Sequence, residues 1–321
     1  MVNAMKKKIL LAVDGSEQAL EAVRYVSRIM PPGQMEVVLL HVMTKIPESF
    51  WDLEREPAFH YKIVNIRQWE QQQEELIEDF MTSAQRLLLD AGFSRDSFRI
   101  DIRERQEGIA RDIFAESQKG YDAVVLGRTG LSELKDLILG SVANKLMERL
   151  TNVPMWIIGG SPQPGKILLS LDTSDWALRA ADYVGSVVDG SAAEILLFHA
   201  VRGFDIFQKS QGQSFVPDHA KDWLEQAEKE LAEASRAMGP IFEEAGKRLR
   251  SAGVQADKIK RKTVTGVSSR AGAIVAEAQQ AGYDTIVVGR RGLSKVQEFF
   301  MGRVSNKVIQ MARKMAVWVV S

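Results

Sequence analysis

One 24-residue stretch occurs twice in this chain, and this repeat constrains the architecture more than any other feature. Residues 121–144 read YDAVVLGRTGLSELKDLILGSVAN, and residues 283–306 read YDTIVVGRRGLSKVQEFFMGRVSN. Each copy begins with an apolar, β-branched run, which is typical of a strand buried on both faces. Glycines follow in both copies with the spacing G-x2-G-x9-G. The chain therefore contains two similar units.

The first half alternates strand and helix patterns. Helical periodicity is found near residues 19–29, 68–91, 109–117 and 141–150, between strand patterns at 8–13, 36–42, 98–103, 123–126 and 153–158. This alternation predicts an α/β fold with a parallel sheet covered by helices on both faces. Such sheets bind ligands beyond the carboxyl ends of their strands, where the winding direction reverses. Asp14 follows the first strand and Gly127 the fourth, so these two loops are expected to face each other.

The second half repeats this pattern after a Gly- and Pro-rich linker at 159–165. Its strand patterns lie at 166–171, 194–199, 258–264, 285–288 and 316–320. We therefore expect two domains, 1–160 and 161–321. The intervals near 43–67 and 202–220 interrupt the similarity, and we expect the first to be irregular, with its aromatic side chains packed on its own domain.

Composition excludes several classes of protein. The 42 basic and 42 acidic residues give a net charge of zero, which argues against a nucleic-acid partner. The absence of cysteine excludes disulfides, thiolate metal sites and a cysteine nucleophile. No run approaches the ~18 apolar residues of a membrane span, so we expect no membrane association and a cytoplasmic protein.

The glycine stretch has the chemistry of a phosphate site. Gly127 and Gly130 allow close approach of an anion to the backbone, and either can adopt a positive φ in a nest-like turn. Gly140 and Ser141 begin a helix whose free N–H groups attract anions. A simple strand-to-helix turn explains the spacing equally well. Neither a Walker A loop nor G-x-G-x-x-G is present.

Three segments together resemble the universal stress protein family: AVDGS at 12–16, LLHV at 39–42 and GRTGLSELKDLILGS at 127–141. Nucleotide-binding members of that family carry G-x2-G-x9-G-[ST], which the first half matches at every defined position. The resemblance implies two tandem Rossmann-like (adenine nucleotide alpha hydrolase-like) domains. Each would have a five-stranded parallel sheet of order 3-2-1-4-5 with helices on both faces. The implied ligand is ATP, or AMP or ADP, with or without magnesium.

The same resemblance implies the site residues. In the first half they are Asp14 near the nucleoside, Val42 near the adenine, and Gly127, Arg128, Gly130, Gly140, Ser141 and Val142 around the phosphates. The matching positions of the second half are Asp172, Gly289, Gly292 and Gly302. Arg303, however, stands where the motif has Ser or Thr, and Arg290 and Arg291 add positive charge. Arg303 could bind phosphate or fill the pocket, and we expect reduced or altered binding in this half.

No catalytic group or metal site is assigned. His41 and His199 lie at strand ends among apolar residues and are expected to be structural. Asp14-Gly15-Ser16 is better explained as a turn with a helix cap than as a nucleophile.

The resemblance predicts a stress-response protein that acts as a nucleotide-dependent sensor or regulator. Alternatives are a slow ATPase or phosphotransferase that uses Asp14 with magnesium, and a nucleotide-free interaction scaffold. The apolar closing strands predict an internal pseudo-dimer of the two domains, with Trp156 and Trp318 near the seam. A homodimer and an unidentified protein partner stay open.

Overall fold

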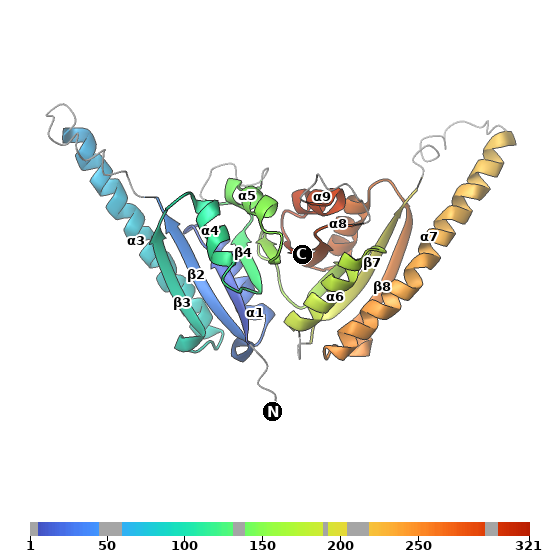
Figure 1. The fold of residues 1–321 in the computed structure, drawn as a ribbon, viewed down its shortest axis with the longest axis horizontal. Helices are drawn as coiled ribbons and strands as arrows, with labels where there is room; N and C mark the ends of the chain where they lie inside the picture. Colours follow the sequence, from blue (N-terminus) through green and yellow to red (C-terminus); the bar gives the residue numbers. More distant parts are fainter. Residues whose placement is uncertain (1–5, 45–59, 131–138, 189–191, 204–217, 293–300) are drawn as a thin grey trace. The chain divides into compact units, whose positions relative to one another are not determined.

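The computed structural model describes residues 6–44, 60–130, 139–188, 192–203, 218–292 and 301–321 (Figure 1). Contacts divide the chain into two compact units, Met1–Val153 and Pro154–Ser321. Each unit is an α/β structure, as the sequence predicts. The domain boundary after residue 160 stays a prediction.

The described residues of the first unit form four parallel strands in the order β3-β2-β1-β4. They are β1 (Lys7–Ala12), β2 (Met35–Met43), β3 (Phe98–Glu104) and β4 (Ala123–Gly127). Helices α1 (Glu17–Ile29) and α3 (His60–Asp90) pack together on one face, and α4 (Ile109–Ser117) and α5 (Ser141–Arg149) on the other (Figure 1). Two 3-10 turns, Pro32–Gln34 and Arg95–Ser97, precede β2 and β3.

In the second unit, the part of the chain that the structure describes forms six strands in the order β5-β10-β9-β6-β7-β8. Five of them repeat the order 3-2-1-4-5: β6 (Lys166–Ser170), β7 (Glu194–Arg202), β8 (Ile259–Val267), β9 (Thr285–Gly289) and β10 (Ala316–Val320). Its helices are α6 (Asp175–Val188), α7 (Asp218–Ser251), α8 (Arg270–Ala281) and α9 (Arg303–Met311), with a 3-10 turn at Ala256–Lys258.

The sixth strand, β5 (Met155–Ile158), comes from the first repeat and pairs antiparallel with β10. Trp156 lies opposite Trp318, and their buried rings stack with centroids 4.2 Å apart. The Trp156 indole nitrogen donates to the Tyr183 hydroxyl at 3.0 Å. The predicted pairing of the two closing strands is therefore observed.

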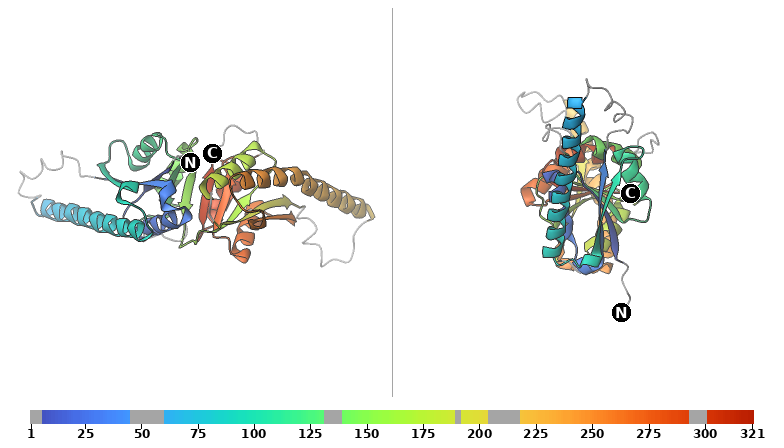
Figure 2. Two further views of the ribbon diagram at one scale, coloured as in Figure 1. Left: turned by 90° about the horizontal axis from the view of Figure 1, so that it is seen from below. Right: turned by 90° about the vertical axis from the view of Figure 1, so that its left-hand side faces the viewer.

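Helices α3 and α7, with 31 and 34 residues, are longer than the strands that they cover. Helix α3 begins at His60, so the expectation of an irregular segment up to residue 67 was wrong, whereas 45–59 lie outside the described residues. No Gly or Pro, the residues that break helices, occurs between Pro57 and Gly92, so the helix can begin soon after Pro57. Figure 2 shows α3 projecting beyond the sheet of its unit.

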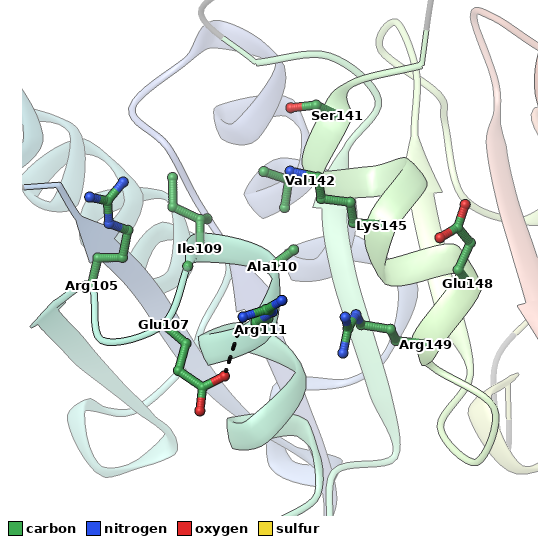
Figure 3. A pocket seen from close by; sticks show the side chains of 11 residues that line it. Arg105, Glu107, Ile109, Ala110, Arg111, Ser141, Val142, Lys145, Glu148 and Arg149 are labelled. Carbon is green, nitrogen blue, oxygen red and sulfur yellow. Dashed lines mark ion pairs between the residues drawn. The ribbon is translucent and has the colours of Figure 1, made fainter.

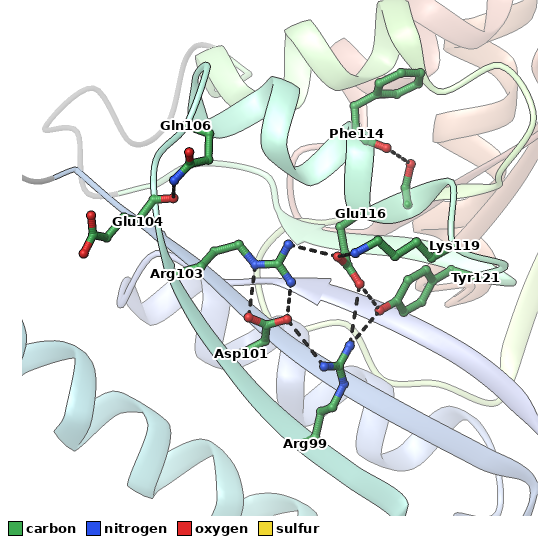
Figure 4. Close-up of polar contacts among 10 residues, drawn as sticks. Arg99, Asp101, Arg103, Glu104, Gln106, Phe114, Glu116, Lys119 and Tyr121 are labelled. Carbon is green, nitrogen blue, oxygen red and sulfur yellow. Dashed lines mark hydrogen bonds and ion pairs between the residues drawn. The ribbon is translucent and has the colours of Figure 1, made fainter.

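An ionic cluster around the buried Glu116 joins edge strand β3 to α4 and to the residues that precede β4 (Figure 4). The Glu116 carboxylate accepts hydrogen bonds from Tyr121 at 2.8 Å, Arg103 at 2.9 Å and Lys119 at 2.8 Å. Its side chain is only 1% exposed. Burial favours the protonated acid, but these three donors outweigh it and hold the pKa of Glu116 at about 2. Burial and the bond to Glu116 raise the pKa of Tyr121 to about 12.

Candidate functional site

The loops after β1 and β4 meet at the carboxyl edge of the first unit's sheet. The two strands are parallel neighbours, with Ala12 opposite Leu126. Asp14 lies directly against Gly130, because a Cβ at position 130 would be 2.2 Å from Asp14 Oδ2. The predicted approach of these loops is therefore observed.

Asp14 is oriented by its own turn. Its Oδ1 accepts from the Ser16 backbone N–H at 3.1 Å, and Gly15 between them has a φ of 83°. The Ser16 hydroxyl accepts from Ala19 N at 3.1 Å and caps α1. The prediction of a turn with a helix cap is confirmed. This turn fixes one carboxylate oxygen of Asp14 and directs the other at Gly130.

The glycines serve close packing rather than an unusual backbone conformation. Neither Gly127 nor Gly130 has a positive φ, so neither adopts the nest-like conformation that a glycine permits. A Cβ at Gly127 would lie 3.0 Å from the carbonyl carbon of Gln18, so this glycine lets the first turn of α1 approach β4. Gly140 N donates to the Arg128 carbonyl at 2.9 Å and so ties the start of α5 to the end of β4.

Helix α5 begins at this meeting point. Gly140 is its N-cap and has no side chain that could accept from the N–H groups of the first turn. Ser141 is exposed and Val142 is half-buried, whereas Arg128 is buried with 6% exposure. Val42 is buried at the end of β2, 5% exposed. The donors at the start of α5 suit an anion.

A cavity of about 520 Å³ opens beside this helix, between α5 and the loop that precedes α4 (Figure 3). Two predicted residues, Ser141 and Val142, line it. Sequence reasoning missed the others, which are Arg105, Glu107, Gly108, Ile109, Ala110, Arg111, Lys145, Glu148 and Arg149. A signal was available: Lys145 and Arg149 follow Ser141 at intervals of four residues, which places all three on one face of a helix.

The second unit reproduces the contact between carboxylate and glycine. A Cβ at Gly292 would lie 2.5 Å from Asp172 Oδ2, and Asp172 Oδ1 accepts from Ser174 N at 3.0 Å. Gly302 N donates to the Arg290 carbonyl at 2.8 Å. A Cβ at Gly289 would lie 3.3 Å from the Trp176 Cβ.

The predicted cluster of three arginines is not uniform. Arg303 and Arg291 are exposed, and Arg303 is the first residue of α9. Arg290 is 2% exposed, and burial, with a smaller contribution from Arg291, lowers its pKa to about 10. Only two of the three charges therefore face solvent, a difference that the sequence pattern did not reveal.

A model of the universal stress protein family matches residues 5–159 and again 164–321. The chain belongs to this family. A universal stress protein of Mycolicibacterium smegmatis is 24% identical over 97% of this chain and 96% of its own length. Universal stress protein YxiE of Bacillus subtilis is 30% identical over 46% of this chain and 93% of its own length. A solved universal stress protein from Archaeoglobus fulgidus covers 98% of both chains with a TM-score of 0.60 at 20% identity, which supports the tandem fold.

Two histidines of this universal stress protein, His41 and His199, form hydrogen bonds with backbone carbonyls just after β1 and β6. His41 Nδ1 donates to the Val13 carbonyl at 2.9 Å, and His199 Nδ1 to the Leu171 carbonyl at 2.7 Å. Burial lowers the pKa of both imidazoles. Among the described residues, no three His, Asp or Glu side chains gather as metal ligands, and no helix is long and apolar enough to cross a membrane.

Proposed function

We propose that the protein is a cytoplasmic adenine-nucleotide binder that responds to stress by coupling ATP occupancy of its first repeat to its conformation. The contact of Asp14 with Gly130, beside the uncapped start of α5, carries this proposal. This contact places the Asp14 carboxylate, which can accept hydrogen bonds from ribose hydroxyls, beside the start of α5, whose N–H groups suit phosphate. A nucleotide needs both kinds of partner.

In the proposed complex, Asp14 Oδ2 accepts hydrogen bonds from the ribose, and Val42 packs against the adenine. The phosphates run along Gly130 and Gly140 to the backbone N–H groups of Ser141 and Val142. Gly127 and Arg128 hold the loop in place through their contacts with α1 and Gly140. ATP supplies phosphate ligands for magnesium when it carries the ion.

We further propose that the second repeat binds nucleotide more weakly. It keeps Asp172 against Gly292, but an exposed arginine, Arg303, replaces the small serine at the start of α9. A long cation here competes with the ligand for space, and its lost rotamer freedom opposes any phosphate contact that it makes.

The sensor is preferred to an enzyme because no general base is found at the described part of the site. The nearby imidazole of His41 is engaged by the Val13 carbonyl. Asp14 has one oxygen engaged by Ser16. A slow ATPase or phosphotransferase would have to rely on the other oxygen of Asp14 and on magnesium.

The decisive experiment uses the freshly purified full chain. Mass spectrometry of the small molecules that it releases, followed by calorimetric titration with ATP and a phosphate-release assay, separates the alternatives. We expect bound adenine nucleotide, one strong site per chain and no turnover. Sustained phosphate release would identify an enzyme instead, and a chain that neither carries nor binds nucleotide would be a scaffold.

A further inference from the structure

The cavity beside α5 continues the proposed phosphate site. Ser141 and Val142 line it at one end, and Lys145 and Arg149 extend it along the same helix (Figure 3). At ~1.5 Å per residue, the eight steps from Ser141 to Arg149 span about 12 Å. The cavity is therefore long enough for several phosphate groups in series.

Its lining carries an excess of positive charge. It includes four cationic side chains, of Arg105, Arg111, Lys145 and Arg149, and two carboxylates, of Glu107 and Glu148. Within the described residues, the only ion pair among these six is between Arg111 and Glu107, at 3.8 Å. Both partners are largely exposed, at 57% and 72%, so this pair neutralises little of the charge. An anion in the cavity would therefore meet cations that carboxylates do not already satisfy.

The loop that carries Arg105 is held in place from within the protein. Asp112, only 9% exposed, accepts from the backbone N–H groups of Gln106 at 2.9 Å and Glu107 at 3.1 Å. The equivalent residue of the second repeat, 162 positions later, is Ile274, which cannot make these bonds. The first repeat thus has a pre-organised wall opposite α5.

Three of the four cations are also particular to the first repeat. The residues 162 positions after Arg105, Arg111 and Arg149 are uncharged. They are Val267, Ala273 and Met311. The fourth, Lys145, corresponds to Lys307. The sheet and its helices form in the second repeat without the other three charges, so the fold does not require them.

We propose that this cavity binds the distal part of a phosphate chain longer than a triphosphate, so that the ligand class of the first repeat includes nucleotides with four or more phosphates in series. This assignment rests on the proposed nucleotide site, which supplies the nucleoside and the first phosphates. Each added phosphate gains charge-assisted hydrogen bonds from Lys145, Arg149 and Arg105.

The test compares ATP with adenosine 5′-tetraphosphate by calorimetric titration of the full chain at fixed salt and magnesium. The wild type should bind the tetraphosphate roughly tenfold more tightly than ATP. The double variant Lys145→Gln and Arg149→Gln should lose this preference and keep its ATP affinity within about threefold. Both side chains are exposed, and an unchanged melting temperature verifies that the variant folds.

Lys307→Gln, the matched control in the second repeat, should leave the preference unchanged. Equal affinities of the wild type for ATP and the tetraphosphate would overturn the inference about the cavity but not the proposed nucleotide site. A preference for the tetraphosphate that survives in the double variant would do the same. If the wild type bound neither ATP nor the tetraphosphate, both the proposed nucleotide site and this inference would be overturned. Inorganic tripolyphosphate that binds as tightly as the nucleotide tetraphosphate would overturn the assignment to a nucleotide.

Discussion

The carboxylate of Asp14 occupies the space that a side chain at Gly130 would need, since a Cβ there would lie 2.2 Å from Asp14 Oδ2. The Ser16 N–H holds the other oxygen, so Asp14 cannot retreat without losing its turn. The site therefore depends on a glycine at this position for its geometry.

Gly130→Val should abolish most ATP binding, because the new side chain displaces Asp14 from the nucleoside end. We expect a loss of at least about tenfold in affinity, or ~1.4 kcal/mol, measured by calorimetric titration. Gly292→Val makes the same collision with Asp172 in the second repeat and should matter less. Comparable losses from both variants would contradict the asymmetry between the repeats.

The first residues of α5 and α9, Ser141 and Arg303, should determine how tightly each repeat binds ATP. Ser141→Arg places an arginine where the first repeat has an exposed serine, and should weaken ATP binding by roughly tenfold. Arg303→Ser should raise the stoichiometry measured by calorimetry from one strong site per chain to two. If Arg303→Ser instead weakened binding, Arg303 would be a phosphate ligand.

The stacked tryptophans should contribute strongly to stability. Trp156→Asp removes a fully buried ring and introduces a charge beside Trp318, so we expect a loss of about 3 to 5 kcal/mol in the free energy of unfolding. Thermal unfolding and limited proteolysis of the full chain measure this loss, and unchanged results would show that the proposed seam is wrong.

Two conservative variants separate stacking from hydrogen bonding at the same pair. Trp156→Phe keeps a ring but loses the bond to Tyr183, at a cost of about 1 kcal/mol beyond the smaller ring. Trp318→Phe should cost less, because the Trp318 indole nitrogen has no hydrogen-bond partner within the described residues.

The sequence predicted those parts of the molecule that depend on local pattern. Apolar runs between turn residues located β4 and β10, and the repeat with its glycine spacing located the loops that meet at Asp14 and Gly130. The start of α3 at His60 was missed although no helix breaker lies between Pro57 and Gly92.

The features that the sequence did not predict depend on tertiary contacts. The role of Gly127 depends on how closely α1 passes it, and no sequence spacing reports that distance. The cavity is lined by both Arg105 and Lys145, which belong to segments far apart in the sequence. The Glu116 cluster likewise joins β3, α4 and the residues that precede β4. Polar residues of this kind look like ordinary surface positions in the sequence.

The Glu116 cluster should determine part of the pH dependence of stability. The folded pKa of about 2 lies below the unfolded value of 4.5, so ionised Glu116 stabilises the fold above about pH 4.5. This contribution is lost as the pH falls from 4.5 towards 2. Glu116→Gln should lower the free energy of unfolding at pH 7 by about 1 to 3 kcal/mol, because three donors lose a buried, charged acceptor.

Chemical unfolding followed at a series of pH values measures both effects. The difference between wild type and Glu116→Gln should be largest near pH 7 and should narrow below pH 4.5, since the wild-type carboxylate becomes protonated there. Glu107→Gln provides the control, because that side chain is 72% exposed and its removal should leave the pH profile nearly unchanged. A constant difference between wild type and Glu116→Gln down to pH 2 would mean that the charge of Glu116 does not stabilise the fold.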